Sequence, residues 1–328
     1  MILRALTSLA APAGARSKLS VFYFHRTLAT PDPLLRGEPD ARMFDNILGW
    51  IGAQFRVLDP LEACERLYSG TLPARPAIIS FDDGYHDNFT VALPILQRHR
   101  MRAAFFVASR FVDGGMMFND RVIETVRRCP DGALQVPMFA QSDPQGLPLR
   151  NDTERRGAIE RILGGVKHLP LAERERRVVE LEREVGTTPM LPMMMSAEQV
   201  KALHDAGMRV GGHTRTHPIL CALGDADAYG EIAGGLEDLA AITGERPTLF
   251  AYPNGRRGKD FDSRHVAMVQ RAGCAYAFTT EPGAAASDSA RFELPRFTPW
   301  DRSRVRFGLR AWRNVGRQAR VPAASRGN

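Results

Sequence analysis

Three absences from the sequence exclude several broad classes of protein. No stretch of the 328 residues approaches the roughly eighteen consecutive apolar residues that a membrane-spanning helix needs. The four cysteines are scattered, so they form neither a metal knuckle nor a dense disulfide framework, and we expect free thiols. The short apolar part of residues 1–18 is interrupted by Ser8 and Pro12, which makes a poor secretory signal. We therefore expect a cytoplasmic protein.

Acidic residues are missing from the end of the chain. Residues 302–328 contain eight arginines and no Asp or Glu, whereas the whole chain has a net charge of +7. The basic charge therefore belongs to this tail, and the rest of the chain is close to neutral. A body without a broad basic surface predicts no nucleic-acid partner.

Short apolar runs alternate with segments of helical periodicity along most of the chain. Helix starts are indicated by a capping box at residues 196–199 and by Asp262 or Ser263. This alternation predicts an α/β fold with a parallel sheet, in which chemistry gathers where the strands end. The seven expected strands cover residues 19–24, 77–81, 103–107, 208–211, 248–252, 275–279 and 292–297.

The expected organisation has three parts. Residues 1–18 lead into a barrel over residues 19–300, and residues 301–328 form a basic helix and tail. Residues from about 112 to 195 interrupt the strand–helix rhythm. We interpret them as an insertion over the barrel mouth, serving as a lid or substrate wall rather than as a separate domain.

Two polar clusters follow predicted strands. Asp82 and Asp83 are adjacent in the SFDDG segment, where one carboxylate could bind a metal while the other faces substrate. The alternative is a pair that caps the helix after residue 88. His213 and His217 lie four residues apart in the GGHTRTH segment, a spacing that lets both reach one metal. Such a pair can be coincidental, but a carboxylate plus two histidines makes a three-ligand site open to water.

These two segments resemble, in order and spacing, the first motifs of polysaccharide deacetylases, the NodB-homology fold of carbohydrate esterase family four. The resemblance covers residues from about 20 to 299. It implies an irregular seven-stranded (β/α) barrel. It also implies that Asp83, His213 and His217 bind one divalent metal and that Asp82 is the catalytic base. Zinc is the expected metal, with cobalt, nickel or iron as alternatives.

The later motifs depart from the family pattern. In the segment at residues 250–255, Ala251 stands where the family has the arginine that orients the base, which leaves the support of Asp82 in question. The N–H of Asn254 is the expected oxyanion donor, and Tyr252 a substrate contact; a plain turn is the alternative. Arg296 stands in place of the family's acid histidine, and because arginine cannot donate a proton we expect it to contact substrate.

A proton donor must therefore come from elsewhere. His25, at the end of the first strand, resembles the first-strand histidine of the exopolysaccharide-modifying branch and is our candidate acid; a structural histidine at the barrel rim is the alternative. Asn119 and Asp120 in the insertion could contact substrate or cap the helix at residues 121–128.

The predicted function is metal-dependent removal of N-acetyl groups from an amino-sugar polysaccharide, oligosaccharide or lipid-linked glycan. This makes the chain a hydrolase of carbon–nitrogen bonds other than peptide bonds. Alternatives are a hydrolase of a cyclic amide or ureide with the same fold, a glycan-binding protein with impaired catalysis, and an iron oxygenase, which also uses two histidines and a carboxylate. The paired aspartates and the order of elements argue against the oxygenase.

The sequence pattern of the tail predicts a basic amphipathic helix. From Val305 onward, apolar residues recur at helical spacing and arginines largely occupy other faces. The helix either packs its stripe on the barrel or rests on an anionic inner-leaflet surface near lipid-linked glycans. The stripe consists of Leu309, Trp312, Val315 and Ala319, and the arginines are Arg306, Arg310, Arg313, Arg317 and Arg320.

Overall fold

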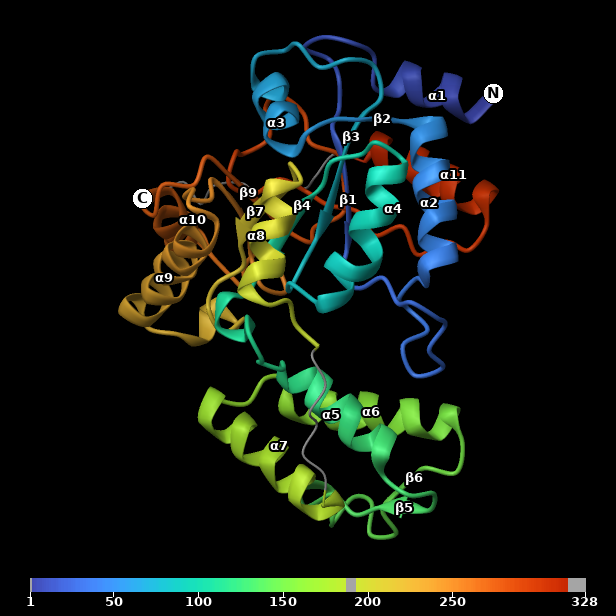
Figure 1. Cartoon of the computed structure of the whole chain (residues 1–328), viewed down its shortest axis with the longest axis vertical. Coiled ribbons are helices and arrows are strands. Elements are labelled where there is room, and N and C mark those ends of the chain that lie inside the picture. Colours follow the sequence, from blue (N-terminus) through green and yellow to red (C-terminus); the bar gives the residue numbers. More distant parts are fainter. Residues whose placement is uncertain (1, 187–192, 318–328) are drawn as a thin grey trace, which may run out of the picture. The chain divides into compact units, whose positions relative to one another are not determined.

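The computed structural model describes residues 2–186 and 193–317, which divide into two compact units (Figure 1). The barrel unit comprises Met1–Thr30, Gly37–Asp113 and Met194–Asn328. The insertion unit comprises Pro31–Arg36 and Gly114–Met193 and corresponds to the insertion expected at residues 112–195. None of the described helices has both the length and the apolar character needed to cross a bilayer.

A parallel sheet forms the centre of the barrel unit, as the alternation of strands and helices predicts. Six strands follow one another in the order β1-β3-β4-β7-β8-β9, and β2 pairs with β3 as the seventh. The strands are β1 (Ser20–Phe24), β2 (Arg56–Val57), β3 (Pro76–Phe81), β4 (Ala104–Val107), β7 (Arg209–Gly212), β8 (Leu249–Ala251) and β9 (Tyr276–Phe278).

The strand expected at residues 292–297 is not formed. This segment makes only single bridges to its neighbours. Leu294 bridges to β9, and its N–H donates to the carbonyl of Ala277 at 2.9 Å. Phe297 bridges to β1, and its N–H donates to the carbonyl of Val21 at 2.7 Å. Pro295 between them has no N–H to continue a ladder. The segment therefore crosses from one edge strand to the other and links β9 to β1.

Alternate side chains of each strand point to opposite faces of the sheet, one toward the surrounding helices and the other toward the barrel interior. Phe22, Phe81 and Phe105 face the helical layer, whereas Val21 and Phe106 face the barrel interior. The Phe81 and Phe105 rings stack with centroids 4.8 Å apart. The helices are α1 (Ile2–Ala10), α2 (Ala41–Gln54), α3 (Pro60–Tyr68), α4 (Leu93–Arg98), α8 (Ala197–Asp205), α9 (Asp225–Thr243), α10 (Ser263–Arg271) and α11 (Arg304–Gly316). Single helical turns are η1 (Asn88–Ala92), η2 (Ser109–Phe111) and η4 (Leu220–Ala222).

Both helix starts predicted from capping signals are confirmed. Ser196 and Gln199 form a capping box at the start of α8, and Asp262 caps α10. Gly207 and Gly273 have positive φ angles of 82° and 91° in the turns that follow the two helices. Each turn leads into the next strand, as expected.

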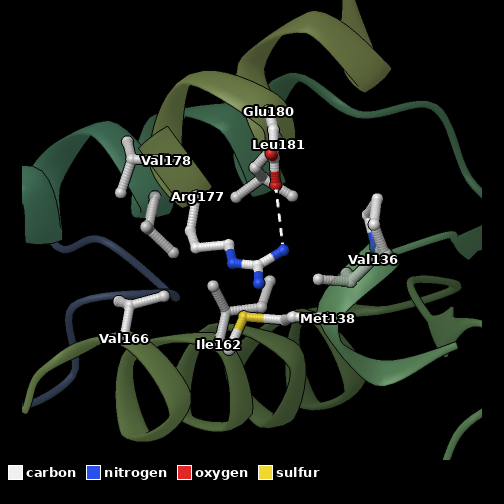
Figure 2. A pocket seen from close by; sticks show the side chains of 10 residues that line it. Val136, Met138, Ile162, Val166, Arg177, Val178, Glu180 and Leu181 are labelled. Atoms are coloured by element: carbon white, nitrogen blue, oxygen red, sulfur yellow. Dashed lines mark hydrogen bonds and ion pairs between the residues drawn. The ribbon is translucent and has the colours of Figure 1, made fainter. Parts of the chain in front are cut away.

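The insertion unit has an apolar core of its own between three helices. It contains α5 (Phe118–Arg128), β5 (Ala133–Leu134), η3 (Pro137–Phe139), β6 (Leu147–Pro148), α6 (Asp152–Val166) and α7 (Leu171–Val185). Arg121 of α5 binds Glu175 and Glu182 of α7. A small cavity lies beside α6 and α7, and the Arg177 guanidinium points into it from its ion pair with Glu180 (Figure 2).

The predicted stripe of the C-terminal helix is wrong in part. Val315 is buried, but Val305 and Leu309 are exposed, and Phe307 and Ala311 take the inward positions on α11. Ala319 and Arg320 lie outside the described residues. The helix therefore packs on the barrel unit with a face shifted from the one that the sequence pattern indicates.

Candidate active site

The two aspartates lie at the carboxyl end of β3, in a turn that requires unusual backbone. Asp82 and Asp83 are buried, with 3% and 6% exposure. Asp83 has a φ of +76° and Gly84 a φ of +91°, and a Cβ on Gly84 would approach Val107 to 2.8 Å. The next helical residues begin at His86, two positions beyond Gly84, and continue into η1 (Asn88–Ala92). The alternative in which Asp82 and Asp83 cap that helix is therefore excluded.

Two histidines from the loop after β7 converge on one oxygen of Asp83. The Nε2 atoms of His213 and His217 each lie 3.4 Å from Asp83 Oδ1. The Nδ1 of His213 donates to the carbonyl of Ala251 at 2.7 Å, so Nε2 is the ring nitrogen that can offer a lone pair to a metal. Burial lowers the pKa of His217 to about 4, so the His217 ring is neutral near pH 7.

This trio fits a divalent cation. Asp83 Oδ1 is buried and has no hydrogen-bond partner among the described residues, which is costly for a carboxylate unless a cation sits beside it. One carboxylate oxygen and two imidazole nitrogens are donors that zinc and similar metals accept, and three protein ligands leave a position for water. The structure thus brings together the three residues that the sequence singled out.

Helix α9 holds the histidine loop in place, a contribution that sequence reasoning missed. Glu231 accepts hydrogen bonds from the backbone N–H groups of Arg215 and Thr216 at 2.9 and 2.8 Å. A Cβ at Gly235 would come within 2.8 Å of the Thr214 backbone, so glycine lets the loop lie directly on the helix. Asp238 pairs with Arg215. An acidic residue with nearby glycines in the next helix is the signal that could have indicated this support.

Arg296 lies beneath the site rather than in it, which corrects the expectation that it contacts substrate. Its side chain has 0% exposure, and its two terminal nitrogens donate to Asp82 Oδ1 at 2.6 Å and Oδ2 at 2.8 Å. Its Nε donates to the carbonyl of Thr279, and its guanidinium stacks on the Tyr23 ring at 4.5 Å. Burial would raise the pKa of Asp82, but the Arg296 charge lowers it below the ordinary value. Asp82 therefore has the arginine support that Ala251 cannot give.

The loop after β8 is built for a backbone donor. Asn254 has a φ of +59°, and its carbonyl accepts from the Thr280 hydroxyl at 2.6 Å. No described residue accepts a hydrogen bond from its N–H. Tyr252 is fully buried and stacks on Phe261 with ring centroids 3.9 Å apart, which corrects its predicted contact with substrate.

His25 follows β1 in a loop that two polar residues fix. Asn88 donates to the His25 carbonyl at 2.9 Å, and Asp87 accepts from the Thr27 N–H at 3.1 Å. Burial lowers the pKa of His25, but the carboxylates of Asp83, Glu38 and Asp82 outweigh it, so the pKa lies above its ordinary value. Both aspartates are thus among the charges that act on this histidine.

Backbone strain concentrates in the loops that carry these residues. Seven described non-glycine residues have a positive φ, and four of them lie in the loops after β3, β7 and β8. Such conformations cost free energy and persist where the surrounding structure enforces them, often at functional sites. The four are Asp83, Thr214, His217 and Asn254.

Asn119 and Asp120 lie in the first turn of α5, after the N-cap Met117, so neither is the N-cap residue. Asp120 has only 2% exposure. Both belong to the insertion unit, and their contact with substrate stays a prediction.

A second group of possible metal ligands consists of Cys221, Asp262 and His265, but two of these residues cap helix α10. Asp262 accepts from the Arg264 N–H, and His265 Nδ1 accepts from the Asp262 N–H as part of the α10 capping box. These lone pairs cap a helix. All four cysteines are free thiols, as expected, and Cys64 and Cys274 are buried.

Comparison with known proteins identifies the family. A sequence model described as polysaccharide deacetylase matches residues 69–137 and 170–277, more than half of the chain. The chain belongs to the polysaccharide deacetylase family. The matched parts carry both aspartates and both histidines, and the family agrees with the predicted class of carbon–nitrogen hydrolase.

Individual relatives are distant but share the fold. The chain is 21% identical over 243 residues to the Bacillus subtilis protein YxkH, named as a polysaccharide deacetylase; the match covers 74% of this chain and only 58% of YxkH. IcaB from Ammonifex degensii is similar with a TM-score of 0.57 and 19% identity, over 92% of this chain and 98% of that one. The Streptococcus pyogenes deacetylase PplD, solved with acetate, gives a TM-score of 0.55 and 17% identity, over 86% and 92%.

Proposed function

We propose that the chain removes N-acetyl groups from an amino-sugar polysaccharide, oligosaccharide or lipid-linked glycan in a metal-dependent hydrolysis. The observation that carries the proposal is the convergence of Asp83, His213 and His217 beside a base candidate, Asp82, that Arg296 holds in place. Family membership supports an acetylated glycan as substrate. The products are acetate and a free amino sugar.

The metal site would be formed by Asp83, His213 and His217, and zinc is the metal we expect because imidazole and carboxylate ligands suit it. When bound, a divalent metal polarises the acetamide carbonyl and lowers the pKa of a water molecule. Cobalt, nickel and iron accept the same donors and remain alternatives. The buried, unpartnered Oδ1 of Asp83 is the feature of the described residues that supports a cation here.

Three residues of the chain divide the proton and charge handling. Asp82, kept ionised by Arg296, takes the proton from the attacking water. The N–H of Asn254 donates to the oxygen on which negative charge develops. His25, whose pKa the nearby carboxylates raise, gives a proton to the departing amine. Arg296 is a positioning residue, since it touches Asp82 and is closed to solvent.

The intact trio and the supported Asp82 favour an enzyme over a glycan-binding protein with impaired catalysis. Acetate release from N-acetylglucosamine oligomers and from lipid-linked glycans, with the metal removed and then restored, tests the proposal. A cyclic ureide serves as the competing substrate. Hydrolysis of the ureide without acetate release from any glycan would overturn the assignment of substrate.

A further inference from the structure

Exposed apolar side chains gather at one pair of helices of the barrel unit. Six large hydrophobic residues are exposed among the described residues, and five of them lie on α1, on α11 or directly before α11. Their exposures range from 39% to 80%. Single exposed apolar residues are common, so the informative feature is that these five lie on neighbouring elements. The five residues are Ile2, Leu9, Trp300, Val305 and Leu309.

The two helices pack against each other, and Figure 1 shows both on the side of the barrel unit where α2 lies. Leu3 of α1 lies against Gly308 of α11 so closely that a Cβ on Gly308 would approach it to 2.6 Å. The Gln54 amide joins them by donating to the Thr7 hydroxyl at 2.9 Å and to the Gly308 carbonyl at 3.2 Å. The helix pair is therefore tied to α2 through a buried side chain.

Packing occupies one face of each helix and leaves an apolar edge on another. In α1, Thr7 is buried, whereas Ile2 and Leu9, seven residues apart, share an exposed side. In α11, Phe307 is buried, whereas Val305 and Leu309, four residues apart, share an exposed side. The barrel core thus accounts for the inward faces and not for these edges.

The charge around the edges has one sign. Residues 1–31 and 302–328 contain no Asp or Glu. On the described part of these segments, Arg4, Arg304, Arg306 and Arg313 are exposed. None of these four guanidinium groups has an ion-pair partner among the described residues; Arg310, by contrast, is paired with Asp301. Apolar edges flanked by unpaired arginines match an interface where lipid chains meet anionic head groups.

We propose that α1 and α11 together dock the protein on the surface of an anionic lipid bilayer, with the apolar edges entering the interface and the arginines binding head groups. The proposal extends the basic C-terminal helix predicted from the sequence to a two-helix surface. It does not depend on the proposed function, because the residues that carry it lie outside the active site.

The test is sedimentation of the full chain with vesicles of phosphatidylcholine alone and of phosphatidylcholine with one quarter phosphatidylglycerol, at low and high salt. We expect binding to the anionic vesicles only, weakened by salt. Arg304→Glu with Arg306→Glu should lower the partition coefficient at least about 30-fold, because each arginine near an anionic surface contributes roughly a factor of five. Arg183→Glu with Lys259→Glu makes the same charge change at exposed residues away from α1 and α11 and should have a much smaller effect.

A second variant tests the apolar edges without changing charge. Leu9→Ser with Leu309→Ser affects exposed positions, so thermal unfolding should stay near that of the parent while anionic-vesicle binding falls. Equal binding to both vesicle types would overturn the proposal. So would binding that is unchanged in both the Arg304→Glu, Arg306→Glu variant and the Leu9→Ser, Leu309→Ser variant. So would a dimer, measured by light scattering, that the serine variant dissociates, because a second copy would then be the occupant of the edges.

Discussion

Arg296 and Asp82, separated by 214 residues in the chain, form a bidentate ion pair with contacts of 2.6 and 2.8 Å. The pair exists because residues 294–297 cross from β9 to β1 and carry the arginine under the end of β3. Ala251, where the family motif has its arginine, leaves that role open in the sequence. An arginine from the segment that links β9 to β1 therefore supplies the positive charge beside the base candidate.

Replacing Arg296 should impair catalysis without removing the metal site. Arg296→Gln removes the charge that keeps Asp82 ionised, so we expect at least a ~10²-fold loss of kcat, the usual scale for a general base. Arg296→Lys keeps the charge and should recover part of the rate. Metal content, measured by elemental analysis, should stay near one ion per chain in both variants.

A double-variant cycle separates this role from simple loss of stability. If Arg296 acts through Asp82, adding Arg296→Gln to Asp82→Asn should slow the reaction little further. Multiplicative losses would mean that Arg296 acts elsewhere. Because breaking a buried ion pair by removing one partner can cost about 3–5 kcal/mol, the unfolding midpoint of each variant is measured alongside.

The sequence predicts those parts of the site that lie where single strands end. Asp82, Asp83, His213 and His217 follow β3 and β7, and parallel strands bring their ends to one edge. The partner of Asp82 could not be predicted in this way, because it depends on how residues 294–297 link β9 to β1.

The direction in which side chains point is the second feature that the sequence does not predict. Tyr252 immediately follows β8, and its ring packs on Phe261 in the core instead of facing substrate. In α11 the sequence shows two overlapping apolar stripes, and only the packing partners decide between them. Gly308 decides which stripe faces inward, because it lets Leu3 approach α11 closely and so turns Phe307 and Ala311 toward the barrel unit.

Changes at the three proposed ligands should remove the metal and keep the fold. His213→Ala or His217→Ala takes away one of two imidazole donors, so purified protein should contain well under one ion per chain. His204→Ala, on the outer helix α8, is the matched control and should retain the parent content. Parent-like metal binding in both site variants would show that the ion, if any, binds elsewhere.

The two adjacent aspartates should give different phenotypes. Asp82→Asn keeps the shape and should bind metal as the parent does, but lose at least ~10²-fold in rate. Asp83→Asn removes the ligand charge and should weaken metal binding itself. Competition with a chelator of known affinity measures the second effect. Reversal of the two phenotypes would mean that base and ligand are exchanged.

Glu231 should matter for the metal although it is not a proposed ligand. It holds the histidine loop through two backbone N–H groups and the Thr216 hydroxyl. Glu231→Gln weakens these charge-assisted bonds, so we expect metal affinity to fall ~10- to 100-fold, as for other changes behind metal ligands. Glu237→Gln, exposed on the same helix, is the control. Equal affinity in the two variants would refute the supporting role of α9.

The proton donor is tested by comparing leaving groups. An acetamide must release an amine, which needs a proton, whereas an activated aryl acetate releases a stable phenolate without one. If His25 is the acid, His25→Ala should reduce turnover of the acetamide at least ~10²-fold and that of the ester only slightly. His25→Gln keeps much of the side-chain volume and should behave in the same way. Equal losses on both substrates would instead assign His25 to positioning, since a misplaced substrate slows both reactions alike, and the source of the proton would have to be sought among the other groups at the strand ends.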